Sequence, residues 1–277
     1  NIVNILLSVW FMTSVMPPEK MGIAGLAWGT FGGWAVGVIM ILRAMRPSKS
    51  SQPVVELKPA LMRWDWSVGK RILRVGIPQL IEILGMWSIH AFGVWMVANR
   101  LMTEGALGAH GMVVQIESIS FMPGFALGIA AGSISGQYLG AGNRRLAKRA
   151  ILSCAGVGVV MMGALGIGMI VFGRELTAII SPSELHQDLV PQLLVIGGSI
   201  QVFFGLGMIC RQGLRGAGDT LTVMLLTMGS SFLIRLPAAW FFGIYMEWGL
   251  VGVWIGLCGE MIPRSFLFLG RVLHGGW

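Results

Sequence analysis

The stretch AILSCAGVGVVMMGALGIGMIVFG, residues 150–173, decides the fold, because none of its 24 residues is Asp, Glu, Lys or Arg. A helix needs about 20 apolar residues to cross the hydrocarbon core of a bilayer. Residues 1–18, 21–42 and 189–210 are uncharged in the same way. Only helices or closed barrels satisfy the backbone in lipid, and the alternation typical of barrel strands is missing. The sequence therefore predicts an all-α, polytopic membrane protein.

Composition excludes the other broad classes of protein. Hydrophobic residues make up 55% of the chain and charged residues 12%, and the mean hydropathy is +0.76. A soluble domain carries about 25% charged residues, and a disordered chain combines low hydrophobicity with high charge. The net charge of +8 would suggest a nucleic-acid partner in a soluble protein. Here we expect no nucleic acid, because the positions of the charges indicate membrane topology.

The apolar runs predict eight membrane helices. Four of the runs, at 1–18, 21–42, 150–173 and 189–210, are free of charge, and the other four, at 75–99, 105–143, 220–246 and 248–270, contain one or two charged residues each. The expected spans cover residues 1–16, 22–43, 72–98, 107–135, 149–172, 190–210, 220–245 and 249–271.

Basic residues gather in alternate loops. Sixteen of the 20 Lys and Arg residues fall on one side of the predicted topology. Loops rich in Lys and Arg stay in the cytoplasm. We therefore expect residues 46–70, 143–149 and 211–219 to be cytoplasmic and residues 174–188 to be external.

A glycine pattern indicates an internal repeat. Gly22, Gly25 and Gly29 recur at a constant offset of 227 in residues 249–256, and a hydrophobic run precedes each copy. Because glycine is abundant here, chance recurrence is the alternative. Six predicted helices separate the copies, and an even number preserves orientation, so the repeats would be parallel.

The repeat predicts a domain organisation. Residues 1–45 would be the last two helices of an amino lobe, residues 46–70 a cytoplasmic linker, and residues 71–277 a complete six-helix carboxyl lobe. The whole protein would then have twelve helices in two parallel six-helix lobes, of which this chain has eight.

Several short motifs occur in a characteristic order. They are GIPQLIE at 76–82, ALGAHG at 106–111, QIESISFMPG at 115–124, SGQYLGAGN at 135–143 and GLRGAGDT at 213–220. Together they resemble the bacterial branch of the multidrug and toxic compound extrusion (MATE) family. The resemblance covers nearly the whole chain and implies twelve helices in two lobes, with the first four helices missing here.

The resemblance also implies a function. It suggests a multi-pass protein of the bacterial cytoplasmic membrane, a secondary active antiporter that exports drugs and other mostly cationic organic compounds in exchange for sodium ions or protons. No cofactor is expected beyond the coupling ion. The expected partners are a small organic substrate and the lipid bilayer, and the full-length protein would be a monomer.

Glu117 and Arg235 are candidates for transport or ion coupling, because a charge at the bilayer centre costs roughly 2.5–3.5 kcal/mol on insertion scales and needs a reason. Glu117 lies deep in its predicted span beside Gln115, and spacing places it near Ser120 on one helix face. It could line a cavity, or it could form a buried structural pair with Arg235. Arg235 could also neutralise Glu82 or extend towards the membrane surface.

Glu82 is the second carboxylate candidate and follows Pro78 by four residues. Proline frees a backbone carbonyl and bends a helix, so polar groups can gather there. Glu82 could bind a cation or a proton, or it could be paired near the cytoplasmic end by Arg71 or Arg74. The acid expected from the family resemblance lies one turn further on, where this chain has Met86.

The resemblance further implies a sodium site in the amino lobe. Asn4 and Thr30 match two of its ligands by spacing, and Ser8 stands where an Asp is expected. A hydroxyl can ligate sodium but brings no charge. Elsewhere, Glu260 and Arg264 have the i, i+4 spacing of a mutual ion pair, which we interpret as structural. His90 and His110 lack a partner at metal-ligand spacing, so no certain metal site is expected.

Two other functions compete with the antiporter. A lipid-linked precursor flippase of the same superfamily should carry a basic cluster for an anionic head group, and one intramembrane arginine argues against it. A membrane-embedded enzyme should show a convergent acid/base or metal cluster, and the sequence contains none, so no enzyme is expected.

Overall fold

The structure, a computed structural model, describes residues 2–13, 18–44, 65–100 and 105–277. These residues are helical apart from short turns and contain no strand. The chain divides into two compact units, Asn1–Trp66 and Ser67–Trp277. Seven helical segments of the described residues are long and apolar enough to cross a membrane, and six of them lie in the second unit. The predicted all-α, polytopic fold is confirmed.

The first unit is a hairpin of α1 (Ile2–Thr13) and α2 (Pro18–Ala44). The helices run antiparallel, because Gly29 packs against Ser8 and Gly33 against Asn4. Glycine at these positions lets the two backbones approach closely. At 12 residues, α1 is shorter than the span predicted for 1–16, and residues 1 and 14–16 of that span lie outside the described residues.

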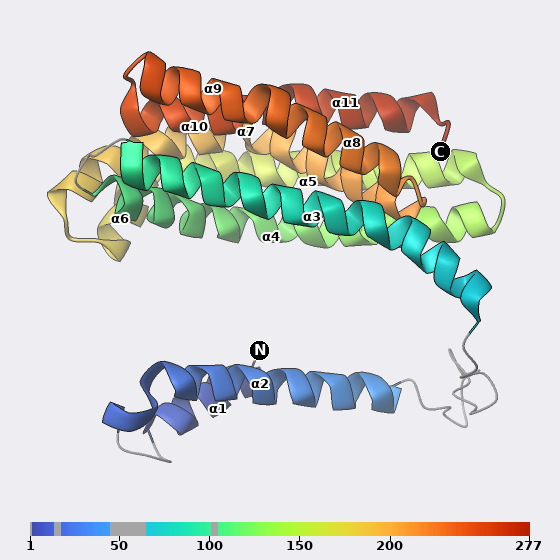
Figure 1. Cartoon of the computed structure of the whole chain (residues 1–277), viewed down its shortest axis with the longest axis horizontal. Helices are drawn as coiled ribbons and strands as arrows, with labels where there is room; N and C mark the ends of the chain where they lie inside the picture. The colour runs from blue at the N-terminus through green and yellow to red at the C-terminus, as the bar shows by residue number, and fades with distance from the viewer. Residues whose placement is uncertain (1, 14–17, 45–64, 101–104) are drawn as a thin grey trace. The chain divides into compact units, whose positions relative to one another are not determined.

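The second unit forms an elongated bundle (Figure 1). Two of its spans are composite, since residues Thr220–Tyr245 and Gly249–His274 each combine several helical segments. Its elements are α3 (Trp66–Arg100), α4 (Ala106–Gly140), α5 (Arg144–Val171), α6 (Gly173–Ile180), α7 (Glu184–Gly216), α8 (Thr220–Ser230), η2 (Ser231–Arg235), α9 (Leu236–Trp240), η3 (Phe241–Tyr245), α10 (Gly249–Gly259) and α11 (Met261–His274).

Some predicted loops are helical instead. The end of the predicted linker at 46–70 belongs to α3, which begins at Trp66, whereas residues 45–64 lie outside the described part. Residues 174–180 belong to α6 and residues 184–188 to the start of α7, with a short non-helical connection at 181–183. Most of the segment 211–219 is the last turn and a half of α7, so Arg211 and Arg215 are helical residues. Amphipathic helix ends extend past the apolar run on which the prediction relied.

Proline interrupts both composite spans. Pro237 follows the π-helical turn Ser231–Arg235, and Pro263 follows the break between α10 and α11 at Glu260. Proline has no N–H to donate, so the helix lacks one ladder hydrogen bond at each of these positions. The helices that carry the glycine repeat therefore differ, because α2 is continuous and its counterpart is broken.

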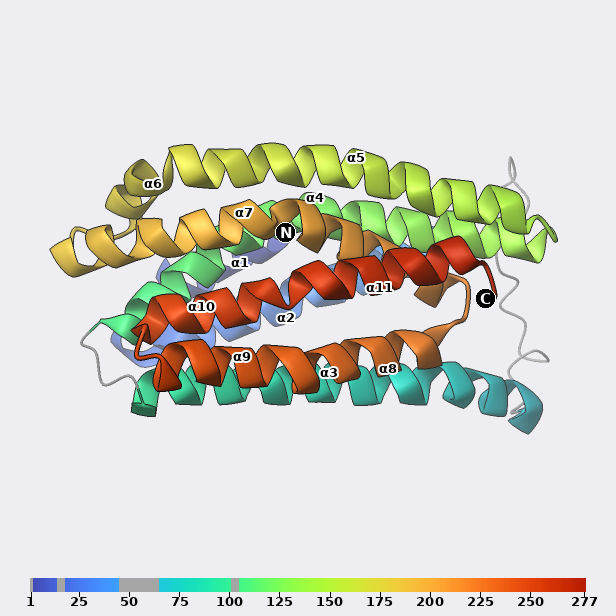
Figure 2. The ribbon, with the colours of Figure 1, turned by 90° about the horizontal axis from the view of Figure 1, so that it is seen from above.

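Helix α7 is the centre of the second unit. Figure 2 shows α5 and α6 along one edge, α3, α8 and α9 along the other, and α7, α10 and α11 between them. Close backbone contacts fix α7 against its neighbours, since Gly166 of α5 meets Gly198 and Gly132 of α4 meets Gly216. The buried Ser135 hydroxyl adds a hydrogen bond of 3.0 Å to the Gly213 carbonyl.

The glycine-rich segments 136–142 and 213–218 are the ends of α4 and α7 and the turns that follow them. Gly142 and Gly218 have φ of 74° and 89°, a conformation that glycine adopts without steric cost. Asn143 then caps α5 by accepting a hydrogen bond of 3.0 Å from the Leu146 N–H.

We expect Gly166→Ala to destabilise the second unit. An added Cβ at Gly166 would meet the Gly198 carbonyl oxygen of α7, and overpacking of this kind costs about 1–3 kcal/mol. Thermal unfolding in detergent measures the loss. Gly168→Ala is the matched control on the same helix, because nothing lies within 4 Å of its added Cβ. Equal unfolding temperatures for the two variants would contradict the close α5–α7 contact.

Candidate functional site

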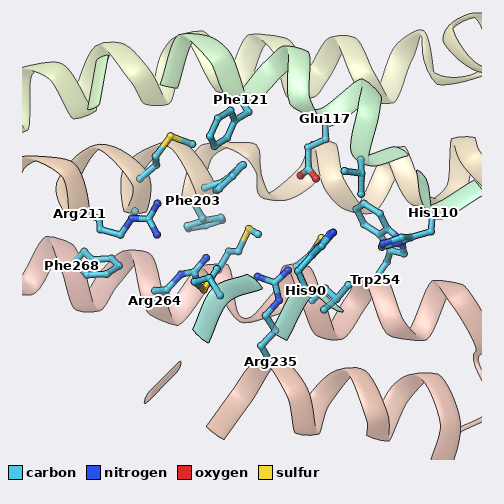
Figure 3. A pocket seen from close by; sticks show the side chains of 18 residues that line it. His90, His110, Glu117, Phe121, Phe203, Arg211, Arg235, Trp254, Arg264 and Phe268 are labelled. Atoms are coloured by element: carbon cyan, nitrogen blue, oxygen red, sulfur yellow. The ribbon is translucent and has the colours of Figure 1, made fainter. Parts of the chain in front are cut away.

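The second unit contains a cavity of about 270 Å³. Side chains of α3, α4, α7, η2, α10 and α11 surround it (Figure 3). Its walls are largely apolar and include the aromatic side chains of Phe121, Phe203, Phe204, Trp254 and Phe268. Ligand pockets commonly combine such apolar walls with a few placed polar groups, so this cavity is the candidate functional site.

Glu117 points into the cavity from α4 (Figure 3). Its Oε1 accepts a hydrogen bond of 3.5 Å from Gln201 Nε2 on α7. Gln201 is fully buried, so it holds the carboxylate from behind. Among the described residues, no Lys or Arg lies within ion-pair distance of Glu117, so the alternative of a close structural pair with Arg235 is not formed.

The polar residues that adjoin Glu117 in sequence do not line the cavity. Gln115 is exposed and is not part of the cavity wall, and its carbonyl accepts a hydrogen bond from Ser118. Ser120 is buried, and Gly124 packs against Met162 of α5. The helical turn therefore separates Glu117 from most of the polar residues that adjoin it in sequence.

Three arginines line the cavity. Arg211 comes from α7, Arg235 from η2 and Arg264 from α11. Figure 3 shows Arg235 and Glu117 entering the cavity from opposite sides. The Nε atom of Arg235 is buried and has no hydrogen-bond partner among the described residues. Arg211 and Arg264 were not candidates from sequence, although Arg264 was expected to pair with Glu260.

Glu82 is not solvated near the end of its helix but is 1% exposed. Its carboxylate forms an ion pair of 2.7 Å with Arg215 and a longer one of 3.6 Å with Arg211. The Thr227 hydroxyl of α8 donates a hydrogen bond of 3.0 Å to it. The partners are therefore arginines of α7 rather than Arg71 or Arg74. Arg211 and Arg215 are four residues apart, so they lie on one helix face. This spacing was the sequence signal that could have identified them as partners of Glu82.

Glu260 and Arg264 form the predicted ion pair, at 3.4 Å. Both residues are buried, and the pair bridges the break between α10 and α11. Two of the three interior carboxylates, Glu82 and Glu260, are thus engaged by arginine, whereas Glu117 is not.

The two intramembrane histidines belong to an aromatic cluster at one end of the cavity. Trp254 Nε1 donates a hydrogen bond of 3.2 Å to His110 Nδ1, and the rings of His90 and His110 lie 6.4 Å apart. An accepting Nδ1 makes His110 a neutral imidazole. Within the described residues, no group of three or more His, Cys, Asp or Glu side chains could hold a metal ion.

The sodium candidates of the first unit lie on the α1–α2 hairpin. The Ser8 hydroxyl donates a hydrogen bond of 3.2 Å to Asn4 Oδ1. Thr30 is exposed, and its hydroxyl donates to the Leu26 carbonyl in its own helix. Asn4 and Ser8 are thus neighbours, and Thr30 bonds elsewhere. Their role as sodium ligands stays a prediction.

Comparison with known proteins gives a consistent family match. The MatE family model matches residues 78–241. A probable multidrug resistance protein NorM from Thermotoga maritima is 30% identical over the whole of this chain, which spans 58% of that relative.

Solved structures share the fold. An outward-facing multidrug resistance MATE transporter of the MOP superfamily aligns with 99% of this chain at a TM-score of 0.86 and 21% identity. A MOP superfamily transporter from Pyrococcus furiosus aligns equally well at 22% identity, and its pocket is described as having reverse polarity, suggesting a different function. This chain spans 61% of each of these proteins.

Replacement of Glu82 by Gln tests its structural role. Gln keeps the volume and can still accept from Thr227, but it leaves the arginines of α7 without their counter-charge. Breaking one side of a buried ion pair costs about 3–5 kcal/mol, so we expect a clear fall in the unfolding temperature. Glu175→Gln, on the exposed face of α6, also removes one negative charge and should leave the unfolding temperature unchanged. Equal stability of both variants would show that Glu82 is not a structural anchor.

Proposed function

This chain belongs to the MatE family, and from that premise we propose that the complete protein is a secondary active antiporter of the bacterial cytoplasmic membrane, exporting small organic compounds in exchange for sodium ions or protons. Its relatives are transporters, and we propose no enzymatic activity. The single observation that carries the proposal is the aromatic cavity with the Glu117 carboxylate in its wall. Because the chain spans less than two thirds of its relatives, these properties are proposed for the complete protein.

Glu117 is the proposed coupling group. Among the described residues, the Glu117 carboxylate is held by an amide alone, at 3.5 Å from Gln201, so it is available to an incoming proton or sodium ion. Binding of that ion changes the charge in the cavity and so shifts the balance between inward-open and outward-open states. Glu82 and Glu260 are less suited to this role, because arginines already neutralise them.

The remaining candidates have supporting roles in this proposal. Arg235 would contact the substrate or tune Glu117 from across the cavity. Asn4, Ser8 and Thr30 remain proposed contributors to a sodium site of the first unit, whereas Gln115 is the weakest candidate because it faces away from the cavity. The proposed protein needs no cofactor, works as a monomer and binds no nucleic acid.

A lipid-linked precursor flippase is the second candidate function. The sequence argued against it because one intramembrane arginine is too few for an anionic head group. The cavity instead has Arg211, Arg235 and Arg264 in its wall, so that objection no longer holds. The reverse-polarity pocket described for the similar Pyrococcus furiosus transporter is a precedent for functional divergence within this fold.

We expect Glu117→Gln to abolish efflux by the complete protein while leaving its expression and unfolding temperature near those of the unmodified protein. The amide is nearly isosteric and can still bond Gln201, but it cannot exchange a proton or attract a cation. Substrate accumulation in a pump-deficient strain measures the loss. Glu82→Gln, corrected for the amount of folded protein, should retain part of the efflux. Normal export by Glu117→Gln would reduce that residue to a packing role.

The proposed orientation predicts which residues a membrane-impermeant thiol reagent can reach. On a background in which Cys154, Cys210 and Cys258 are replaced by Ala, we expect Glu184→Cys to react from outside intact cells and Arg145→Cys to react only after lysis. Both positions are exposed in the structure. The reverse pattern of labelling would overturn the orientation.

A further inference from the structure

The cavity wall carries more positive than negative charge. Arg211, Arg235 and Arg264 line the cavity, and Glu117 is the one carboxylate among its described lining residues. Figure 3 shows the three guanidinium groups reaching inward from three different elements, with Glu117 opposite Arg235. This distribution is not what a cavity selective for cations requires, because like charges repel strongly where water is scarce.

The carboxylates behind the wall do not cancel this excess. Glu82 pairs more closely with Arg215, at 2.7 Å, than with Arg211, at 3.6 Å. Glu260 engages Arg264 at 3.4 Å. Arg235 has no described carboxylate within ion-pair distance. At least one arginine therefore presents an uncompensated charge to the cavity.

The arginines also present unused hydrogen-bond donors. The Nε atoms of Arg211 and Arg235 are buried without a hydrogen-bond acceptor among the described residues. The Arg264 side chain is 9% exposed. A buried donor without an acceptor is unfavourable, so these donors indicate that a ligand supplies the acceptor oxygens.

Guanidinium groups recognise a particular ligand chemistry. Their planar fork matches the two oxygens of a carboxylate or the face of a phosphate or sulfonate, with charge-assisted hydrogen bonds. The aromatic side chains Phe121, Phe203, Phe204 and Trp254 surround the space beside them. The cavity thus offers an anionic subsite next to an apolar one.

We infer that this cavity binds an organic anion, with a carboxylate, phosphate or sulfonate group held by Arg235, Arg211 and Arg264 and an apolar or aromatic body against the phenylalanines and Trp254. The inference rests on the proposed transport function and changes the expected substrate class from cations to anions. A volume of about 270 Å³ suits a compact ring system or the head of a longer chain.

This substrate class constrains the exchange with the coupling ion. A proton or sodium ion on Glu117 would attract an anion in the same cavity rather than exclude it. Exchange therefore requires the ion and the anion to be bound in different conformations of the complete protein.

The test compares two probes that share a ring system but differ in charge. Tritiated 1-naphthaleneacetate and 1-naphthylmethylammonium are bound to the full 277-residue chain in nanodiscs of zwitterionic phosphatidylcholine. We expect the anion to bind at least tenfold more tightly than the cation, since one charge-assisted contact is sufficient for that ratio. Tighter binding of the ammonium probe would overturn the inference, and so would equal binding of the two.

Variants assign the anion to the arginines. Arg235→Gln should weaken naphthaleneacetate binding about tenfold, whereas Arg145→Gln removes the same charge from an exposed position outside the cavity and should have no effect. Equal binding by both variants would contradict the assignment to Arg235. The probe comparison uses the unmodified chain, so the inference stays testable even if Arg235→Gln fails to fold.

Competition identifies the source of the anion. Displacement of naphthaleneacetate by farnesyl phosphate but not by farnesol would point to lipid-linked phosphates, and displacement only by soluble aromatic acids would point to soluble metabolites. Efflux by the complete protein is scored separately. If Glu117-dependent efflux of cations occurs while the anion probe does not bind, the proposed transport function stands and this inference fails. If the anion probe binds but the complete protein exports nothing, this inference stands and the proposed transport function fails.

Discussion

The ion pairs between Glu82 and the arginines of α7 are the interaction on which the second unit depends. In the low-polarity interior of a membrane bundle, a lone carboxylate or guanidinium is costly, and each must find a counter-charge or a polar cavity. Glu82 connects α3 to Arg215 and Arg211 of α7 and to Thr227 of α8. It therefore ties a peripheral helix to the central one at the base of the cavity.

The interior charged residues form two sets, one that holds the helices together and one that is available to a ligand or an ion. Glu82 and Glu260 are fully buried and form ion pairs with arginines, so they contribute to how the helices pack. Glu117 and Arg235 face each other across the cavity without an ion pair, and each is left with capacity for a ligand or an ion (Figure 3). Close glycine contacts hold α4 and α5 against α7, and α4 and α7 both contribute residues to the cavity wall.

The hydrophobic runs were sufficient to predict the class of fold, the approximate spans and the Glu260–Arg264 pair, since these depend on local composition and helical spacing. The partners of Glu82 were not predictable in the same way. Arg211 and Arg215 fall after an apolar run and look like loop residues, but α7 continues to Gly216 and turns them inward. The grouping of Gln115 with Glu117 was equally misleading, because neighbours in sequence point to different sides of a helix. Long-range pairing, rather than local pattern, determined the site.

We propose that Arg215 stabilises the helix packing through its ion pair with Glu82, whereas Arg235 binds the ligand. The most direct measurement compares the thermal unfolding of Arg215→Gln and Arg235→Gln in the same detergent, without any ligand. Arg215→Gln removes the nearer counter-charge of the buried Glu82, so this variant should unfold at a clearly lower temperature than the unmodified chain. Arg235→Gln removes a charge that no described carboxylate balances and should leave the unfolding temperature unchanged or raise it. A larger loss of stability in Arg235→Gln than in Arg215→Gln would contradict the account.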